Sequence, residues 1–483
     1  MNHHLEIFSY NENQDRAYNK HYHQSGKFID NWQEGIKLLP FNSNPASAYD
    51  KKCGLHGTTG EFFRLWDDDG TRPIEDFEKS AVEPVKEYLT NQKQMPIEQI
   101  PEFVRMMRDI MFIDGNLNIT DSAFLKYLPL VPNDERISKK ERNKYKDGQE
   151  KLANYLYSLL SDELQHSGHS DTPNLFSKIL QEALTPFGGT TDEATKRDYT
   201  VLPYIKKSFE EDLNWMLEQE ESVKVKYLHL FLHFYACYGV TQAIVRITAK
   251  DKQKEDMPAP FYFILNSERA SVNHDAVVRG WSYQIPKSSL DKLYGKSQAL
   301  DILNSVLGGN IGFYNNIRDK LNETDFEDNR ELCNELLSKY QEEKREVFNR
   351  RTSESGSIEE IEIDVHSYEE FISTLEYLCT GLQSPSYISR MRKKVIDLLS
   401  VRFLQSRRGN FVLVLDNEML TFLIALFTKS KKTKLEDLYK LFNSYGIYFN
   451  RGSRLAIEEY LLKLNLLDRK SDSGEAQYVT VIL

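Results

Sequence analysis

The sequence has little cysteine, and its few cysteines are not arranged to form a disulfide framework or a zinc site. Cys53, Cys237, Cys333 and Cys379 lie far apart, with no C-x2-C pair among them. Disulfide scaffolds and structural zinc sites use closely and regularly spaced cysteines, so this pattern is typical of reduced thiols. The first residues also lack the charged and then apolar order of a secretion signal. We therefore expect a cytoplasmic protein.

The sequence also lacks a long apolar run that is free of charged residues. Residues 225–247 come nearest to one and are long enough to span a bilayer. They include Lys226, His229, His233 and Arg246, which hydrocarbon would penalise heavily. The pattern predicts a buried central helix and no contact with a membrane.

A nucleotide-binding loop is missing as well. Gly295-Lys296-Ser297 looks like the end of a Walker A motif, which requires another glycine five residues before its Gly-Lys pair. Position 290 is Leu, and the preceding residues have a helical pattern where the motif needs a strand. Without a glycine-rich loop the backbone N–H groups cannot surround phosphates, so we expect no ATP site here.

No familiar catalytic pattern is present. His229 and His233 have the i, i+4 spacing of zinc metalloproteases, but the general-base Glu after the first histidine is missing. Residues 358–365 alternate apolar and acidic side chains, which predicts a strand, yet the Asp364 and His366 at its end are not followed by the Glu-x-Lys of nucleases. We predict no catalytic residue, no metal and no cofactor, and interpret the two histidines as core side chains. The protein is expected not to be an enzyme.

The chain does have the composition of an ordinary globular protein, and the spacing of its apolar residues is mostly helical. Its 483 residues are 28% charged and 12% aromatic, which argues against disorder and suits about two to four domains. The predicted fold is mainly α with minor β, a multi-domain helical body with a C-terminal winged helix-turn-helix. The expected parts are a mixed, mostly helical domain at 1–200, a helical domain at 201–348, a linker at 349–357, a helical connector with a basic face at 358–409 and a winged-helix-like domain at 410–483.

The prediction for 410–483 rests on the order of its elements. The apolar residues 411–415 predict a strand, and Asp416-Asn417 is a good N-cap pair. Three segments then repeat the spacing of an amphipathic helix. Their apolar faces are Leu420, Leu423, Ile424 and Phe427; Leu435, Leu438, Tyr439 and Phe442; and Ile457, Tyr460, Leu461 and Leu464. Residues 466–470 and 477–483 predict a hairpin around the turn-forming residues 471–475.

Positive charge is concentrated near the C-terminus. The whole chain has a net charge of −11, but residues 390–454 contain 14 Lys/Arg and 5 Asp/Glu. An acidic body with a basic end suits a protein that meets phosphate or an acidic partner through one face, and equally suits a solvated surface without a partner. The candidate DNA-binding residues are Arg390, Arg392, Lys393, Lys394, Arg407, Arg408, Lys429, Lys431, Lys432, Lys434, Arg451 and Arg454.

The third predicted helix of this region has an unusual exposed face. A recognition helix presents its exposed face to the bases of DNA. Here the side opposite the apolar face has Leu455, Glu459 and Leu462. Only Arg451 and Arg454 near the start of the helix, and Lys463 on its flank, suit phosphate. We therefore predict that Leu455, Glu459 and Leu462 bind a protein partner and that the basic residues contact DNA.

Two patches resemble a known family. One is the tail 464–479 together with residues 446–451, and the other is the helix 229–247 followed by residues 261–271. Both are similar to the DptG family, a component of the DNA phosphorothioation-dependent restriction system, and the chain length also suits that family. The resemblance implies a restriction or antiviral-defence complex that acts on unmodified DNA, with double-stranded DNA and ATPase- or helicase-like subunits as partners.

Two functions are compatible with these observations. The first is a non-catalytic DNA-binding and scaffolding subunit of such a restriction complex. The second is a stand-alone winged-helix DNA-binding regulator, although the helical body shows no pattern of a ligand pocket. A regulator should bind one DNA sequence tightly by itself, whereas a scaffold should bind weakly or only within its complex.

Overall fold

The computed structural model shows a mainly helical protein with small mixed sheets, about 65% helix and 7% strand. The prediction of a mainly α fold with minor β is therefore confirmed. The structure describes residues 22–23, 27–28, 37–68, 70–92, 95–113, 116–119, 121–167, 175–184, 199–248, 256–266, 279–307, 312–351, 359–407, 409–469 and 477–480.

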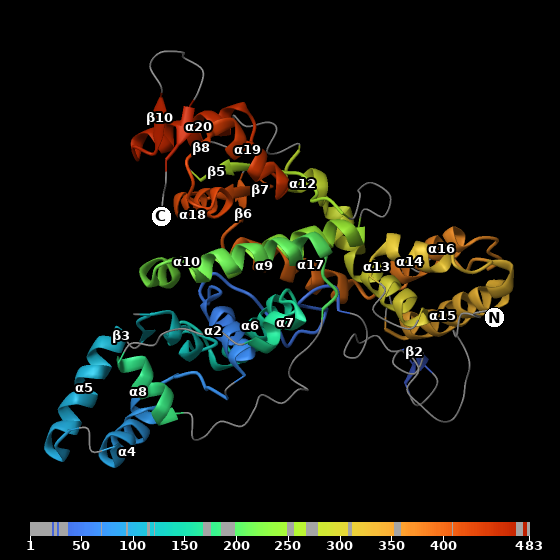
Figure 1. Ribbon diagram of the computed structural model, residues 1–483. Coiled ribbons are helices and arrows are strands. Elements are labelled where there is room, and N and C mark those ends of the chain that lie inside the picture. Colours follow the sequence, from blue (N-terminus) through green and yellow to red (C-terminus); the bar gives the residue numbers. More distant parts are fainter. Residues whose placement is uncertain are drawn as a thin grey trace.

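One long helix, α10 (Glu221–Thr248), crosses the middle of the molecule and has other elements on both sides (Figure 1). It is apolar on nearly all faces, the pattern of a helix that is surrounded by protein. By length and composition it is the one helix of the described chain that could cross a membrane, and 94% of its most apolar window is buried inside the protein. The prediction of a buried central helix is confirmed.

The N-terminal helices pack on one side of α10. Glycine at position 239 permits the crossing of α10 with α6, because a Cβ there would collide with the Tyr155 hydroxyl. Ser138 and Glu141 form a capping box that fixes the start of α6. The helices are α2 (His56–Asp67), α3 (Phe77–Ser80), α4 (Val82–Gln92), α5 (Ile100–Met111), α6 (Lys139–Tyr157), α7 (Asp162–Ser167), α8 (Leu175–Leu184) and α9 (Pro203–Leu217), with 3-10 turns at Ile97–Gln99 and Ser122–Tyr127 and a short hairpin β3–β4 (Phe112–Ile113, Asn116–Leu117). The short hairpin β1–β2 (Tyr22–His23, Lys27–Phe28) lies instead against the later helix α15 (Arg330–Arg351) (Figure 1).

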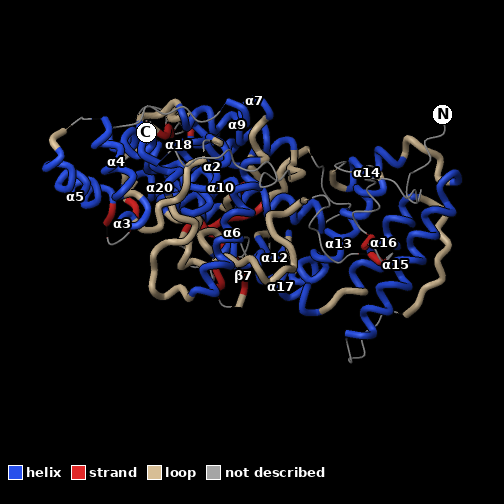
Figure 2. Tube along the Cα trace, turned by 90° about the horizontal axis from the view of Figure 1, so that it is seen from below, coloured by secondary structure: helices blue, strands red, loops and turns tan. Residues whose placement is uncertain are grey.

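A second helical group lies at the end of the molecule opposite α4 and α5, as both views show (Figures 1 and 2). In it α13 packs against α16 and α17, and α15 packs against α16. Its elements are α13 (Lys287–Val306), α14 (Tyr314–Leu321), a 3-10 turn (Glu327–Asn329), α15 (Arg330–Arg351), α16 (Tyr368–Gly381) and α17 (Pro385–Ser400). The short helix α12 (Trp281–Gln284) precedes them and packs on two strands of the sheet described below.

The strand predicted at 358–365 is wrong over its described part, because residues 359–366 have no regular secondary structure. Their backbone is held by side chains of α15. The Ile361 N–H donates to Gln341 Oε1 at 3.1 Å, and the Val365 N–H donates to Asn334 Oδ1 at 2.9 Å. These amide side chains replace the neighbouring strand that the alternating pattern would need.

A four-stranded sheet joins the middle of the chain to its end. Its order is β6-β7-β5-β9, formed by β6 (Leu404–Arg407), β7 (Asn410–Leu415), β5 (Phe261–Leu265) and β9 (Ile447–Tyr448). β5 is parallel to both neighbours, with Ile264 opposite Val414 and Phe261 opposite Ile447. The apolar sequences of β5 and β7 suit strands that are covered on both faces.

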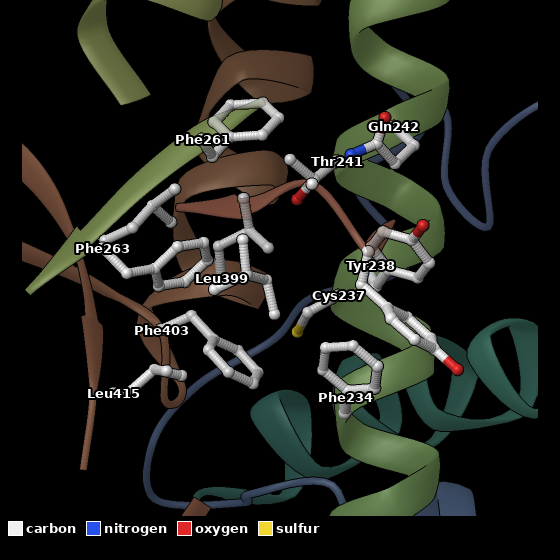
Figure 3. A pocket seen from close by; sticks show the side chains of 14 residues that line it. Phe234, Cys237, Tyr238, Thr241, Gln242, Phe261, Phe263, Leu399, Phe403 and Leu415 are labelled. Atoms are coloured by element: carbon white, nitrogen blue, oxygen red, sulfur yellow. The ribbon is translucent and has the colours of Figure 1, made fainter. Parts of the chain in front are cut away.

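The space between α10 and this sheet is filled by apolar side chains. Figure 3 shows Phe234 and Cys237 of α10 facing Phe263 of β5, with Leu399 and Phe403 between them. The cavity that remains there is only about 40 Å³. We interpret this contact as core packing between the central helix and the sheet.

Residues 417–479, here called the C-terminal unit, contain the helices and strands that the sequence predicts. Asp416 accepts a hydrogen bond from the Met419 N–H and caps α18, and Asn450 caps α20 through the Ser453 N–H. A second sheet has the order β10-β11-β8 with antiparallel pairing. The elements are α18 (Asn417–Thr428), β8 (Thr433–Lys434), α19 (Leu435–Ser444), α20 (Arg451–Lys463), β10 (Leu467–Arg469) and β11 (Gln477–Val479). The predicted hairpin loop 471–475 lies outside the described residues.

The four-stranded sheet contains strands from two of the predicted domains. β5 comes from the predicted domain 201–348, whereas β7 and β9 come from 410–483. The predicted linker 349–357 begins within α15, and its residues 352–357 lie outside the described residues. A piece that starts after the linker would lose the strand between β7 and β9, so we expect the two halves to fold together.

Limited proteolysis provides a test of this interdependence. We expect cleavage within 349–357 to leave two fragments that elute together in gel filtration, because hydrogen bonds of β5 and packing of α13 on α16 and α17 join them. Separation should require denaturant. Fragments that elute apart under native conditions and remain folded would instead establish independent domains.

Candidate interaction surface of the C-terminal unit

The exposed face of α20 is a stripe of four side chains. Arg451, Leu455, Glu459 and Lys463 recur every four residues, and all of them are exposed. Leu455 is 52% exposed in the middle of the helix. The stripe therefore has an apolar centre, one carboxylate and a cation near each end.

The structure places the other candidates of this helix differently. Leu462 is partly buried and packs against the hydrophobic core, so it does not share the exposed stripe. The guanidinium of Arg454 lies 4.6 Å from the ring centroid of Tyr439. Leu464, which we predicted on the buried face, is 45% exposed just after the helix ends.

The basic residues of α17 are used within the protein. Lys394 is 5% exposed and donates to Ser47 Oγ at 2.6 Å, and burial lowers the pKa of its ammonium to about 7. Arg392 pairs with Asp291 at 2.5 Å. The remaining two are closer to solvent, since Lys393 pairs with Asp397 and Arg390 stacks on the ring of Tyr387.

Two further candidates also have internal partners. Arg407 donates to the backbone oxygen of Asn266 at 3.0 Å. Lys429 forms an ion pair with Asp212, which is 2% exposed in its side chain. Tyr235 and Tyr445 donate to the same carboxylate at 2.6 and 2.9 Å. Arg408 lies outside the described residues.

The candidates that face solvent most openly are near β8 and at the start of α20. Lys431, Lys432 and Lys434 are exposed around β8, and Arg451 is exposed on α20. Lys432 pairs with Asp468, with both side chains half exposed. The candidate DNA-binding residues thus fall into two groups. Some of them form contacts within the fold, and a smaller group remains exposed for contact with phosphate.

Sequence reasoning missed a cluster of histidines beside α10. His56, His229 and His233 line one cavity of about 290 Å³, and the rings of His56 and His229 stack with centroids 5.1 Å apart. The only local signal was the i, i+4 spacing on α10, since His56 lies far away in the sequence. Among the described residues, no group of three or more His, Cys, Asp or Glu side chains is arranged to hold a metal ion.

Comparison with known proteins gives no family: no family model and no curated protein sequence matches this chain.

Proposed function

We propose that this protein is a non-catalytic DNA-binding and scaffolding subunit of a DNA phosphorothioation-dependent restriction complex that acts on unmodified DNA. Its partners would be double-stranded DNA and ATPase- or helicase-like subunits. The resemblance of residues 229–271 and 446–479 supports the pathway. The observation that carries the proposal is the exposed stripe of α20 within the C-terminal unit.

We further propose that the C-terminal unit is a winged helix-turn-helix. Its chain order is α18-β8-α19-α20-β10-β11, and its sheet order is β10-β11-β8. Three helices with a hairpin whose second strand pairs with the strand after the first helix support this interpretation. In such a unit α20 takes the position of the recognition helix and β10–β11 form the wing.

The side chains of α20 favour protein docking over base readout. A major groove is lined by phosphates and polar base edges, and the centre of the stripe offers Leu455 and Glu459. An exposed leucine beside the Glu459 carboxylate and the Lys463 ammonium suits the anchor and rim of a protein interface. The exposed cations Lys431, Lys434 and Arg451 are better placed for phosphate.

A pair of variants tests this division. Leu455→Asp is expected to abolish capture of the partner subunits in a pulldown and to leave DNA affinity unchanged, because it places a charge in the apolar centre. Lys431→Glu with Lys434→Glu and Arg451→Glu is expected to keep the partner. This triple variant should weaken DNA binding uniformly across sequences and reduce the salt slope by about 3.

Leu464→Asp is the matched control for Leu455→Asp, because Leu464 is similarly exposed but lies beyond the stripe. It should retain the partner. If Leu455→Asp instead changes base preference and keeps the partner, α20 reads DNA. Tight binding of one DNA sequence by the isolated protein would favour the stand-alone regulator.

A further inference from the structure

Five lysines form a basic surface on the N-terminal part of the molecule. Residues 136–146 contain six Lys/Arg and one Asp/Glu, in a chain whose net charge is −11. The five are Lys51 and Lys52 in the loop before α2, which are exposed, and Lys139, Lys140 and Lys144 of α6, of which only the last is half-buried. We call them the α6 basic surface. None of the five forms an ion pair with a carboxylate in the part of the chain that the structure describes.

Contacts between the loop and α6 hold these lysines on one surface. The Ala48 N–H donates to the carbonyl oxygen of Lys144 at 3.0 Å, so the loop lies against the second turn of α6. Hydrogen bonds from Ser138 are the main cause that lowers the pKa of the Glu141 carboxyl, and the nearby charges of Lys52 and Lys144 lower it further. Lys52 therefore lies near the start of α6, although it is far away in the sequence.

The positive charge continues from α6 toward α17. Lys394 of α17 donates to a side chain of the segment that leads into the same loop. Burial is the main cause that lowers the pKa of Lys394, and the charges of Lys151, Arg390 and Lys144 lower it further, while Asp147 opposes them. Arg390 thus extends the α6 basic surface onto a second helix.

The carboxylates near the α6 basic surface already have partners. Glu141 accepts hydrogen bonds from Ser138 in the capping box of α6. Asp134 pairs with Arg136 at 2.6 Å, and Asp50 accepts from a backbone N–H of its own turn at 2.8 Å. Even with the charges of Glu141 and Asp50 counted in full, the five lysines leave a positive surface. Because the capping box also uses N–H groups at the start of α6, the ammonium groups and not the helix N-terminus would meet an anion.

The side chains between these lysines favour a nucleic acid over the other polyanions of a cell. Protein interfaces are organised around apolar or aromatic anchors, and helices that lie on membranes insert apolar side chains. Within the described segments 44–54 and 133–151, no large apolar side chain is exposed. Contacts to the phosphates of a duplex need only cations and polar groups. The α6 basic surface offers these and no apolar anchor.

We propose that the α6 basic surface is a second contact for the phosphate backbone of double-stranded DNA, separate from the contact of the C-terminal unit. This inference rests on the proposed function, which supplies DNA as the partner. α6 and α20 lie on opposite sides of α10 (Figure 1). The two contacts are therefore far enough apart to contribute independently to DNA affinity.

Fluorescence anisotropy of the full-length protein with a mixed-sequence duplex tests this inference over a range of salt concentrations. Lys139→Glu with Lys140→Glu and Lys144→Glu is expected to weaken DNA affinity about tenfold and to reduce the salt slope by about 3. The variant should fold, because glutamate in the first turns of a helix suits the helix dipole. Its loss of affinity should multiply with that of the Lys431, Lys434 and Arg451 variant.

A second triple variant is the matched control for net charge. It replaces Lys178, Lys207 and Lys320 with glutamate, three lysines that are exposed on α8, α9 and α14. Because the change in net charge is the same, it should leave the DNA affinity and the salt slope nearly unchanged if DNA meets the α6 basic surface. Equal weakening by both variants would overturn the proposal, since affinity would then follow net charge alone.

Unchanged DNA binding by the α6 variant would also overturn the proposal. If the variant of Lys431, Lys434 and Arg451 weakens binding in the same assay, the proposed function then stands with the C-terminal contact alone. Loss of binding to vesicles that contain phosphatidylserine, with DNA affinity unchanged, would assign the α6 basic surface to a membrane. A parent protein that binds no DNA at low salt would overturn both DNA contacts, and partner capture in a pulldown would still report the scaffolding role.

Discussion

Replacing Lys429 with glutamate is expected to destabilise the protein by about 3 kcal/mol or more, the cost of removing one partner of a buried ion pair. The Asp212 carboxylate is 2% exposed and would lose its cation while gaining a second carboxylate nearby. Burial already raises the pKa of Asp212, and Lys429 opposes that change. The free energy of unfolding in urea measures the effect.

Lys431→Glu is the matched control, since Lys431 is exposed two residues away. Its effect should stay within about 0.5 kcal/mol, as is usual for surface substitutions. Adding Asp212→Asn to Lys429→Glu should recover part of the loss, because it removes the buried carboxylate and keeps an oxygen that can accept from Tyr235 or Tyr445. Equal effects of Lys429→Glu and Lys431→Glu would show that the ion pair does not support the fold.

Acid is expected to destabilise the protein through the histidine cluster formed by His56, His229 and His233. Above about pH 6.5 an imidazole is neutral in both folded and unfolded chains, so the cluster contributes no pH dependence there. Below that pH the unfolded chain binds protons that the folded cavity resists, so stability falls as the pH decreases toward the lowered pKa values. His229 and His233 each contribute up to about 1.4 kcal/mol per pH unit, and the exposed His56 less, because solvent screens it.

Urea unfolding at pH 7, 6 and 5 measures this slope. His229→Gln should reduce the slope by about one proton relative to the parent protein, while carboxylates elsewhere contribute equally to both and cancel. His366→Gln should leave the slope unchanged. A slope that is the same in the parent and His229→Gln would contradict the account, as would greater stability at pH 5 than at pH 7.

Local patterns predicted the elements of this protein better than its long-range contacts. The apolar spacing of Leu420, Leu423 and Phe427 is a local property, and α18 lies there. No local pattern of residues 261–265 indicated that they would lie between strands formed by residues 410–415 and 447–448. The periodicity of apolar residues indicates which side of a segment is buried, but it does not indicate which distant segment covers that side.

The candidate surface shows the same limit. A count of charges in 390–454 could not show that Lys394 reaches Ser47 or that Lys429 reaches Asp212. These partners lie far away in the sequence, and they turn apparent surface cations into parts of the fold. The helical arithmetic did identify Leu455 and Glu459 as exposed, because that inference needed only the geometry of one helix.

The position of β5 also has a consequence for synthesis of the chain. Residues 261–265 leave the ribosome long before either neighbouring strand exists, so the apolar strand must remain unpaired along both edges until β7 and β9 follow. Strands with unpaired edges tend to pair with other chains. Pairing between strands that are far apart in the sequence, as β5 is from β7 and β9, also slows folding. Nascent or prematurely ended chains that stop before residue 410 should therefore depend on chaperones, and the yield of soluble protein should depend more on the speed of translation than on the stability of the finished fold.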